Sequence, residues 1–76
     1  MKAAKQGHAR SQRNLGLLHC TGEGVPLDYI EAYKWMILAV ANGDEDARKS
    51  KDHFRGQMTF DQIEKAQHRA RKFLGQ

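Results

Sequence analysis

Cysteine, proline and long apolar runs are scarce or absent in this chain of 76 residues. The single cysteine, Cys20, has no partner for an intramolecular disulfide, which fits a reducing compartment. No run of the sequence is apolar and long enough to span a bilayer, and the N-terminal residues contain no apolar signal core. We therefore expect a soluble chain, cytoplasmic if it is complete. The alternative is a longer precursor whose signal peptide has been removed.

The length and the net charge of the chain limit the number of domains it can form and the kinds of partner it can bind. Seventy-six residues allow one small domain, near the lower size limit for a core that lacks a metal, a disulfide or a partner. The net charge is +4, and residues 1–13 contain four basic residues and no acidic one. A basic end favours acidic partners, among which nucleic acid and anionic lipid are possible. An ordinary solvated surface has the same composition.

Two glycines, Gly7 and Gly43, lie thirty-six positions apart in similar surroundings. Each follows an alanine-rich segment that resembles the end of a helix, and each precedes a segment that resembles the start of another. Self-similarity at this period is typical of helical repeat arrays, in which each unit buries its apolar face against its neighbours.

The local patterns predict four helices and no strand. We expect them at about residues 8–20, 28–42, 44–55 and 59–74, with glycine stops at Gly22, Gly43 and Gly56. N-cap boxes are predicted for Asp28 with Glu31 and for Thr59 with Gln62, and a simple N-cap for Asp44.

The apolar positions predict how these helices pack. The second is apolar on two sides, so it needs a neighbour on each. The third is polar except for Ala47 and Phe54. On the first, the three- and four-residue spacing places Ala9, Gln12, Leu15, Gly16 and His19 near one face. We take Ser11, Leu15 and His19 as its packed side and expect Gly16 to let another backbone come close. The fourth is expected to have one apolar stripe, made of Phe60, Ile63, Ala66, Ala70, Phe73 and Leu74.

Taken together, these residues resemble the Sel-one-like repeat, a relative of the tetratricopeptide repeat. The leucine–glycine pair, the glycine-bracketed turn and the alanine-x-x-tryptophan motif are fairly specific as a set. The residues of this structural signature are Leu15, Gly16, Gly22, Gly24, Asp28, Ala32, Trp35, Ala39 and Gly43. The resemblance implies an all-α fold, namely a helix-turn-helix repeat (an α-solenoid fragment) with a C-terminal closing helical hairpin.

The same resemblance divides the chain into three parts. Residues 1–6 are the tail of a preceding repeat unit, residues 7–42 one complete repeat, and residues 43–76 a degenerate terminal repeat with its closing helix. Ser11 and His19 depart from the alanine and the aromatic that the family prefers. Lys51 and Asp52 replace the leucine–glycine pair in the next unit.

The sequence gives little support for catalysis, metal binding or phosphate binding. The four histidines do not recur at three- or four-residue spacing and there is no second cysteine, so a zinc site is not expected. A nucleophilic pair of Cys20 with His53 or His68 is conceivable but has no supporting motif. The turn at Gly22 follows a helix and contains Glu23, which disfavours phosphate binding. We expect no enzyme activity, no cofactor and no metal.

The resemblance instead implies a non-enzymatic adaptor that binds a protein partner. The first helix commonly lines the binding face of such arrays, and we expect the contact residues to be Arg10, Arg13, Asn14 and Leu17. The alternative is a basic helical module that docks on nucleic acid or anionic membrane through Lys65, Arg69, Arg71 and Lys72. The N-terminal side has almost no neighbour, so we expect the chain either to be the end of a longer array or to self-associate through that face.

Overall fold

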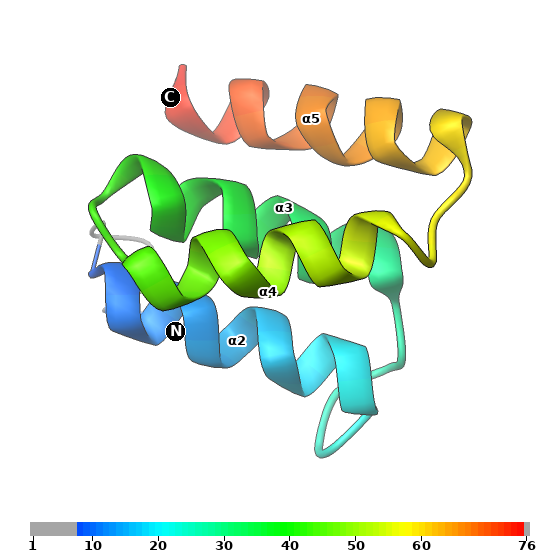
Figure 1. The fold of residues 1–76 in the computed structure, drawn as a ribbon, viewed down its shortest axis with the longest axis horizontal. Helices are drawn as coiled ribbons and strands as arrows, with labels where there is room; N and C mark the ends of the chain where they lie inside the picture. The colour runs from blue at the N-terminus through cyan, green and yellow to red at the C-terminus, as the bar shows by residue number, and fades with distance from the viewer. Residues whose placement is uncertain (1–7, 76) are drawn as a thin grey trace.

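The computed structural model describes residues 8–75, which form four helices joined by short turns (Figure 1). They are α2 (Ala9–Thr21), α3 (Tyr29–Ala41), α4 (Glu45–Arg55) and α5 (Phe60–Leu74). No strand occurs among these residues, and the predicted all-α fold is confirmed. The predicted tail of a preceding unit, residues 1–6, lies outside the described residues.

Glycine and carboxylate caps set the ends of the helices, as the sequence predicts. Gly22 follows α2 with a φ of 75°, a left-handed conformation that favours glycine, and its N–H donates to the Leu18 carbonyl at 2.8 Å. Asp44 accepts a hydrogen bond from the Ala47 N–H at 3.0 Å and begins α4. Before α5, Thr59 and Gln62 form both hydrogen bonds of a capping box.

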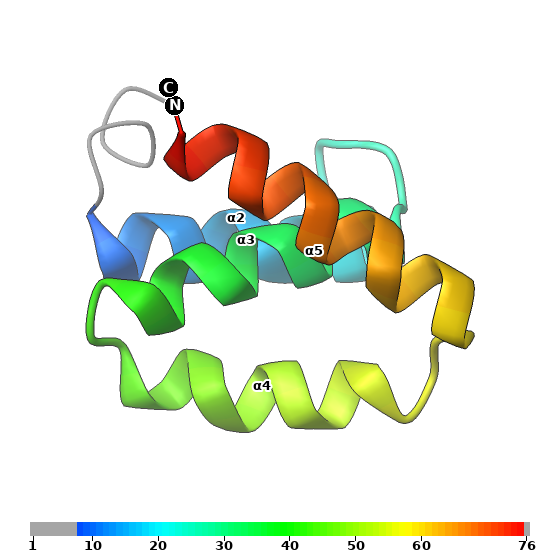
Figure 2. The same cartoon turned by 90° about the horizontal axis from the view of Figure 1, so that it is seen from above.

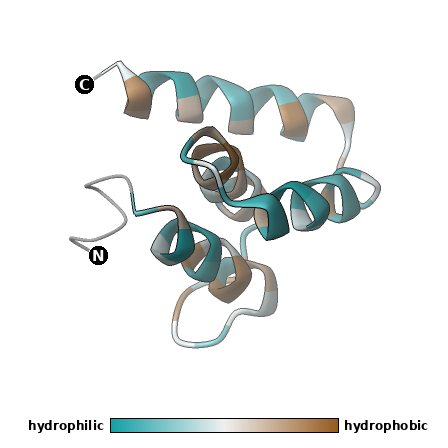
Figure 3. Cartoon of the chain, turned by 60° about the vertical axis from the view of Figure 1, so that its left-hand side comes forward, coloured by the Kyte–Doolittle hydropathy of each residue, from teal (hydrophilic) through white to brown (hydrophobic). Residues whose placement is uncertain are grey.

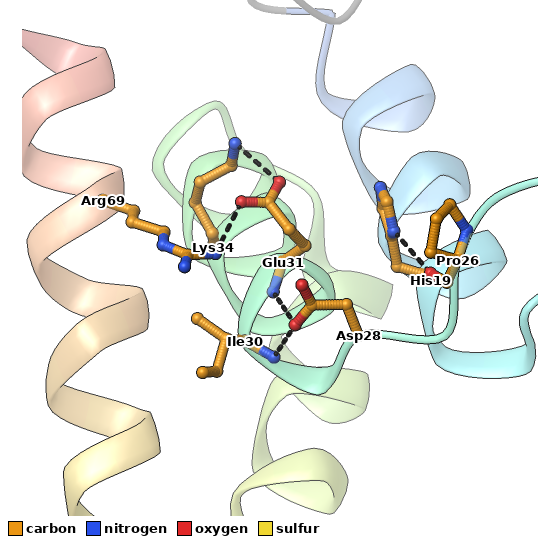
Figure 4. Close-up of polar contacts among 7 residues, drawn as sticks. All are labelled: His19, Pro26, Asp28, Ile30, Glu31, Lys34 and Arg69. Carbon is orange, nitrogen blue, oxygen red and sulfur yellow. Dashed lines mark hydrogen bonds and ion pairs between the residues drawn. The ribbon is translucent and has the colours of Figure 1, made fainter.

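The box predicted at the start of α3 forms only in part. Asp28 accepts from the N–H groups of Ile30 and Glu31 at 3.0 and 3.2 Å, so it is the N-cap. The reciprocal bond, from the Asp28 N–H to the Glu31 carboxylate, is absent, and this half of the prediction was wrong. The Asp28 N–H donates instead to the His19 carbonyl at 2.9 Å, and the Glu31 carboxylate forms ion pairs with Lys34 and Arg69 (Figure 4).

Helix α3 is the centre of the molecule. It packs against α2, α4 and α5, while no other pair of these four helices makes comparable contact (Figures 1 and 2). Figure 3 shows it as an apolar segment among more polar helices. The closing helices α4 and α5 therefore each pack mainly against α3 and have little contact with each other. The buried residues of α3 are Ala32, Tyr33, Trp35, Met36, Leu38 and Ala39.

The core continues from α3 into both closing helices. Ala47 and Phe54 of α4 and Ala66 of α5 are buried with Tyr33 and its neighbours in the larger of two apolar clusters. Ala70 of α5 is buried in the smaller one, beside Trp35 and Leu38. Because α3 is covered by α2 and by both closing helices, its predicted burial on two sides is confirmed.

The apolar stripe of α5 is shorter than predicted. Ala66 and Ala70 are buried and Ile63 and Phe73 are half-buried. Phe60 at one end is 73% exposed and Leu74 at the other is 57% exposed, so the prediction was wrong for both. The reason is geometric: α5 crosses α3 obliquely, so contact is concentrated in its middle (Figure 2).

Candidate protein-binding site on α2

The buried side of α2 is rotated away from Ser11, Leu15 and His19, toward the Gln12 and Gly16 edge of the face that the spacing predicts. Gln12 and Gly16 are its buried residues, whereas Ser11, Leu15 and His19 are half-buried. The expected close approach at Gly16 explains the rotation. A Cβ atom on this residue would lie 3.0 Å from the Ala32 carbonyl oxygen and 3.0 Å from a side-chain carbon of Met36. Helix α3 therefore lies against the bare side of Gly16, and α2 turns that side inward.

Gln12 is a buried polar residue on the face that the three- and four-residue spacing of α2 predicts. It is 1% exposed, and its Oε1 accepts a hydrogen bond from the Asn42 side-chain amide at 3.0 Å. The same amide group donates to the Leu38 carbonyl at 3.0 Å. Gln12 thus ties the start of α2 to the end of α3. Its spacing, four residues before Gly16, predicted that both lie on one face, but not that Asn42 is its partner.

Three of the four predicted contact residues lie in one exposed row. Arg10, Asn14 and Leu17 are exposed and recur at four- and three-residue spacing along α2. Thr21, which sequence reasoning missed, continues the row. Its hydroxyl donates to the carbonyls of Leu17 and Leu18 at 3.2 and 3.3 Å. The row faces away from α3, because Gln12 and Gly16 occupy the opposite side.

Arg13 lies beside this row, at the edge nearest α4. Its Nε donates to the Asp44 carboxylate at 2.8 Å, and the two side chains are 23% and 10% exposed. The hydrogen bond to Asp44 raises the pKa of Arg13. The ion pair connects α2 to the N-cap of α4, two helices that otherwise have little contact. Arg13 therefore helps to hold the fold, and Arg10 is the freer of the two arginines.

The carboxylate of Asp44 makes this connection sensitive to pH. Burial by itself raises the pKa of Asp44, but the hydrogen bonds from Arg13 and from the Ala47 N–H outweigh it and lower the pKa overall. Because folding lowers this pKa, the ionised carboxylate stabilises the fold above about pH 4, the ordinary pKa of aspartate. That contribution is lost as the pH falls through the lowered pKa of the folded state.

We expect Asp44→Asn to be destabilising at neutral pH by up to about 1 kcal/mol, because asparagine still caps a helix but cannot pair with Arg13. The difference from the parent protein should shrink as the pH falls through the lowered pKa of Asp44, because protonation removes the charge that pairs with Arg13. Urea unfolding at several pH values measures this difference in the free energy of unfolding. Glu45→Gln is the control, since Glu45 is 80% exposed and lies 3.8 Å from Arg48. An equal loss at all pH values would contradict the assigned charge effect.

The groups considered for reactive chemistry lie in ordinary structural positions. Cys20 is half-buried against the larger core cluster, and burial raises the pKa of its thiol. His19 donates through Nδ1 to the Pro26 carbonyl at 3.1 Å and so braces the loop between α2 and α3 (Figure 4). From residue 8 to residue 75, no three histidine, cysteine or acidic side chains form a group that could hold a metal ion.

The residues of the structural signature lie where α2 and α3 meet and turn. Leu15 packs against the smaller core cluster and Gly16 against Ala32. Trp35 and Ala39 are buried. The remaining members shape the ends of the helices: Asp28 is an N-cap, and the three glycines with positive φ are Gly22, Gly24 and Gly43.

Helix α5 contains the basic residues of the alternative site. Lys65, Arg69, Arg71 and Lys72 are all exposed. Arg69 donates through Nη1 to the Glu31 carboxylate at 2.9 Å and so links α5 to α3 (Figure 4).

In the part of the chain that the structure describes, no helix is long and apolar enough to cross a membrane.

Comparison with protein families gives one result. Residues 9–44 match the family model described as the Sel1 repeat, and the resemblance inferred from the sequence is confirmed. The matched segment spans α2, α3 and the N-cap of α4. Sel1 repeats generally mediate protein–protein interaction and are typically non-enzymatic. A search of curated proteins finds no match to this chain.

Proposed function

We propose that this chain, whose residues 9–44 are a Sel1 repeat, is a non-enzymatic adaptor that binds a protein partner through the outer side of α2. The α2 patch consists of Arg10, Arg13, Asn14 and Leu17. The observation that carries the proposal is the exposed row of Arg10, Asn14 and Leu17 on a helix whose opposite side is fixed against α3. Leu17 is 37% exposed and offers an apolar contact beside two arginines. Arginine beside an apolar anchor is common at the centre of interfaces.

The α2 patch is supported from behind, which favours binding without rearrangement. Gly16 sits against Ala32, and Gln12 is hydrogen-bonded to Asn42. Arg13 is held by Asp44 at the edge of the patch. A surface fixed in this way loses little conformational entropy when a partner binds, so modest contacts suffice for affinity.

The test is capture of partners from a lysate by the purified chain, with and without nuclease, followed by mass spectrometry. Arg10→Glu/Leu17→Asp should reduce nuclease-resistant protein partners at least tenfold, because it reverses a charge and places a charge in the apolar contact. Arg13 is left unchanged, since its substitution would break the ion pair with Asp44. Lys49→Glu/Phe60→Asp is the matched control, at exposed positions on α4 and α5.

The same protein variants also test the two other expectations, namely nucleic-acid binding by α5 and self-association. Capture that nuclease abolishes and that Arg10→Glu/Leu17→Asp leaves unchanged would contradict the proposal and favour the basic α5. Sedimentation of the purified chain shows whether copies associate. A dimer that Arg10→Glu/Leu17→Asp disrupts would identify a second copy as the occupant of the α2 patch. Equal capture by the parent, the double variant and the control would exclude the α2 patch as the binding surface.

A further inference from the structure

Asn42 and Gly43 form an asparagine–glycine pair at the end of α3. In such a pair the glycine nitrogen can attack the side-chain carbonyl carbon of the asparagine, because glycine has no Cβ to hinder the approach. Asparagine is one of the thermolabile residues of proteins. The other asparagine of the chain, Asn14, lies within α2 and precedes Leu15, whose side chain hinders the same attack. The chemistry is therefore expected at Asn42.

The reaction at this pair is deamidation, which consumes only water. The Gly43 nitrogen forms a bond to Cγ of Asn42, and the bond from Cγ to Nδ2 breaks. Nδ2 leaves as ammonia and takes the proton of the Gly43 N–H. Water then opens the five-membered imide ring at one of its two carbonyl carbons. The product is aspartate or isoaspartate, and each carries a negative charge where the asparagine was neutral.

Hydrogen bonds hold both reacting groups in the folded chain. Nδ2 of Asn42, the leaving group, donates to Oε1 of Gln12 and to the Leu38 carbonyl, each at 3.0 Å. The Gly43 N–H, the nucleophile, donates to the Val40 carbonyl at 3.0 Å. The ring can form only after the nitrogen of Gly43 turns toward Cγ and Nδ2 is released. These hydrogen bonds must therefore break before the reaction.

Little besides these hydrogen bonds protects the pair. Asn42 and Gly43 are both exposed, so water reaches them. A Cβ built on Gly43 would meet no atom of residues 8–75 within 4 Å, so packing does not restrain this turn. Of the hydrogen-bond partners named above, only Gln12 comes from another helix, and it is 1% exposed on the buried side of α2. The position of α2 therefore controls the reactivity of Asn42.

We propose that Asn42 is a deamidation site that becomes reactive when the start of α2 separates from α3, and that the modification then keeps α2 loosened. A carboxylate at this position has no N–H to donate to Gln12 or to the Leu38 carbonyl. The buried Oε1 of Gln12 would face another acceptor, which costs stability. A transient local opening thereby becomes permanent. The inference holds whether or not the α2 patch binds a partner.

The experiment follows deamidation of the full chain at neutral pH by peptide mapping and mass spectrometry. Asn42 should react roughly tenfold faster or more in urea that unfolds the chain than in the folded chain, and Asn14 should stay unmodified in both. Below the unfolding transition the rate should rise little with urea, because local opening exposes little surface. Equal rates in the folded and the unfolded chain would overturn the proposal, as would a rate that follows the unfolded fraction.

Two variants test the control by α2. Gln12→Met removes the acceptor but keeps most of the buried volume, and should raise the rate at Asn42 about fivefold, the effect of one lost hydrogen bond on an opening equilibrium. Gln62→Ala is the matched control, because it removes a hydrogen bond of the capping box before α5, and should leave the rate unchanged. Circular dichroism checks that both variants are folded. Equal acceleration in the two would overturn the proposal.

Asn42→Asp tests the effect of the modification on α2. It should lower the midpoint of thermal unfolding by roughly 4–8 °C and speed amide hydrogen exchange of Gln12. Asn14→Asp, which adds the same charge at an exposed position of α2, should not lower the midpoint. Equal midpoints for the two variants, or unchanged exchange at Gln12, would show that deamidation does not loosen α2.

Discussion

Replacing Trp35 by alanine is expected to lower the free energy of unfolding by about 3–5 kcal/mol. Trp35 is 6% exposed and lies with Leu38 and Ala70 in the smaller core cluster. Its ring meets that of Phe73 edge-on with centroids 5.4 Å apart, and the Lys34 ammonium lies 4.3 Å from its ring centroid. Alanine would leave a cavity between α3 and α5 and remove both contacts.

Such a loss is large for a chain of this size. A domain of 76 residues is expected to have a total stability of about 4–11 kcal/mol. Trp35→Ala should therefore leave a substantial unfolded fraction, measurable by circular dichroism during urea titration. Phe60→Ala is the matched control, because Phe60 is 73% exposed and should change stability by less than about 0.5 kcal/mol. Similar midpoints for the two variants would contradict the packing of α5 on α3.

Replacing Gly16 by valine is expected to destabilise the protein by about 1–3 kcal/mol or more. The first carbon of any side chain at this position would lie 3.0 Å from the Ala32 carbonyl oxygen. That oxygen belongs to the backbone of α3, so it moves only if the two helices separate. The added methyl groups of valine enlarge the clash. Separation of α2 from α3 would also weaken the hydrogen bond between Gln12 and Asn42.

Gly56→Val is the control for this substitution. Gly56 has a φ of −67°, which any residue adopts, and an added Cβ would meet only the His53 carbonyl oxygen, at 3.5 Å. Thermal unfolding of the two variants compares a glycine between two helices with one at a helix end. We expect a much lower midpoint for Gly16→Val and little change for Gly56→Val. Equal midpoints would show that α2 and α3 do not cross closely at Gly16.

The sequence predicted the elements of this fold well, because their ends depend on local chemistry. The N-caps at Asp44 and Thr59 and the turn at Gly22 each involve residues close in the chain, so spacing alone identifies them. The double-sided apolar pattern of α3 likewise predicted its central place. What spacing could not fix was the rotation of α2, which depends on how closely α3 approaches Gly16.

The contacts that the sequence did not predict join residues far apart in the chain. The ion pair of Arg13 with Asp44 and the hydrogen bond of Gln12 with Asn42 each span about thirty positions. Glu31 was assigned to a local cap, but in the folded chain it meets Arg69 of α5. A carboxylate has several partners available once helices pack, and only the tertiary arrangement selects among them. The candidate site is affected directly, because Arg13 has a structural partner beside the exposed row.

The last residue of the matched repeat, Asp44, has contacts on both sides of the point where the match ends. The match ends at Asp44, yet this residue caps the next helix at Ala47 and pairs with Arg13 near the start of the segment. Within residues 8–75, one side of α3 is covered only by helices that follow Asp44, through Phe54 and Ala70 among others. A fragment cut at Asp44 would leave that side of α3 in water. The segment that matches the repeat family is therefore shorter than the segment whose helices cover α3.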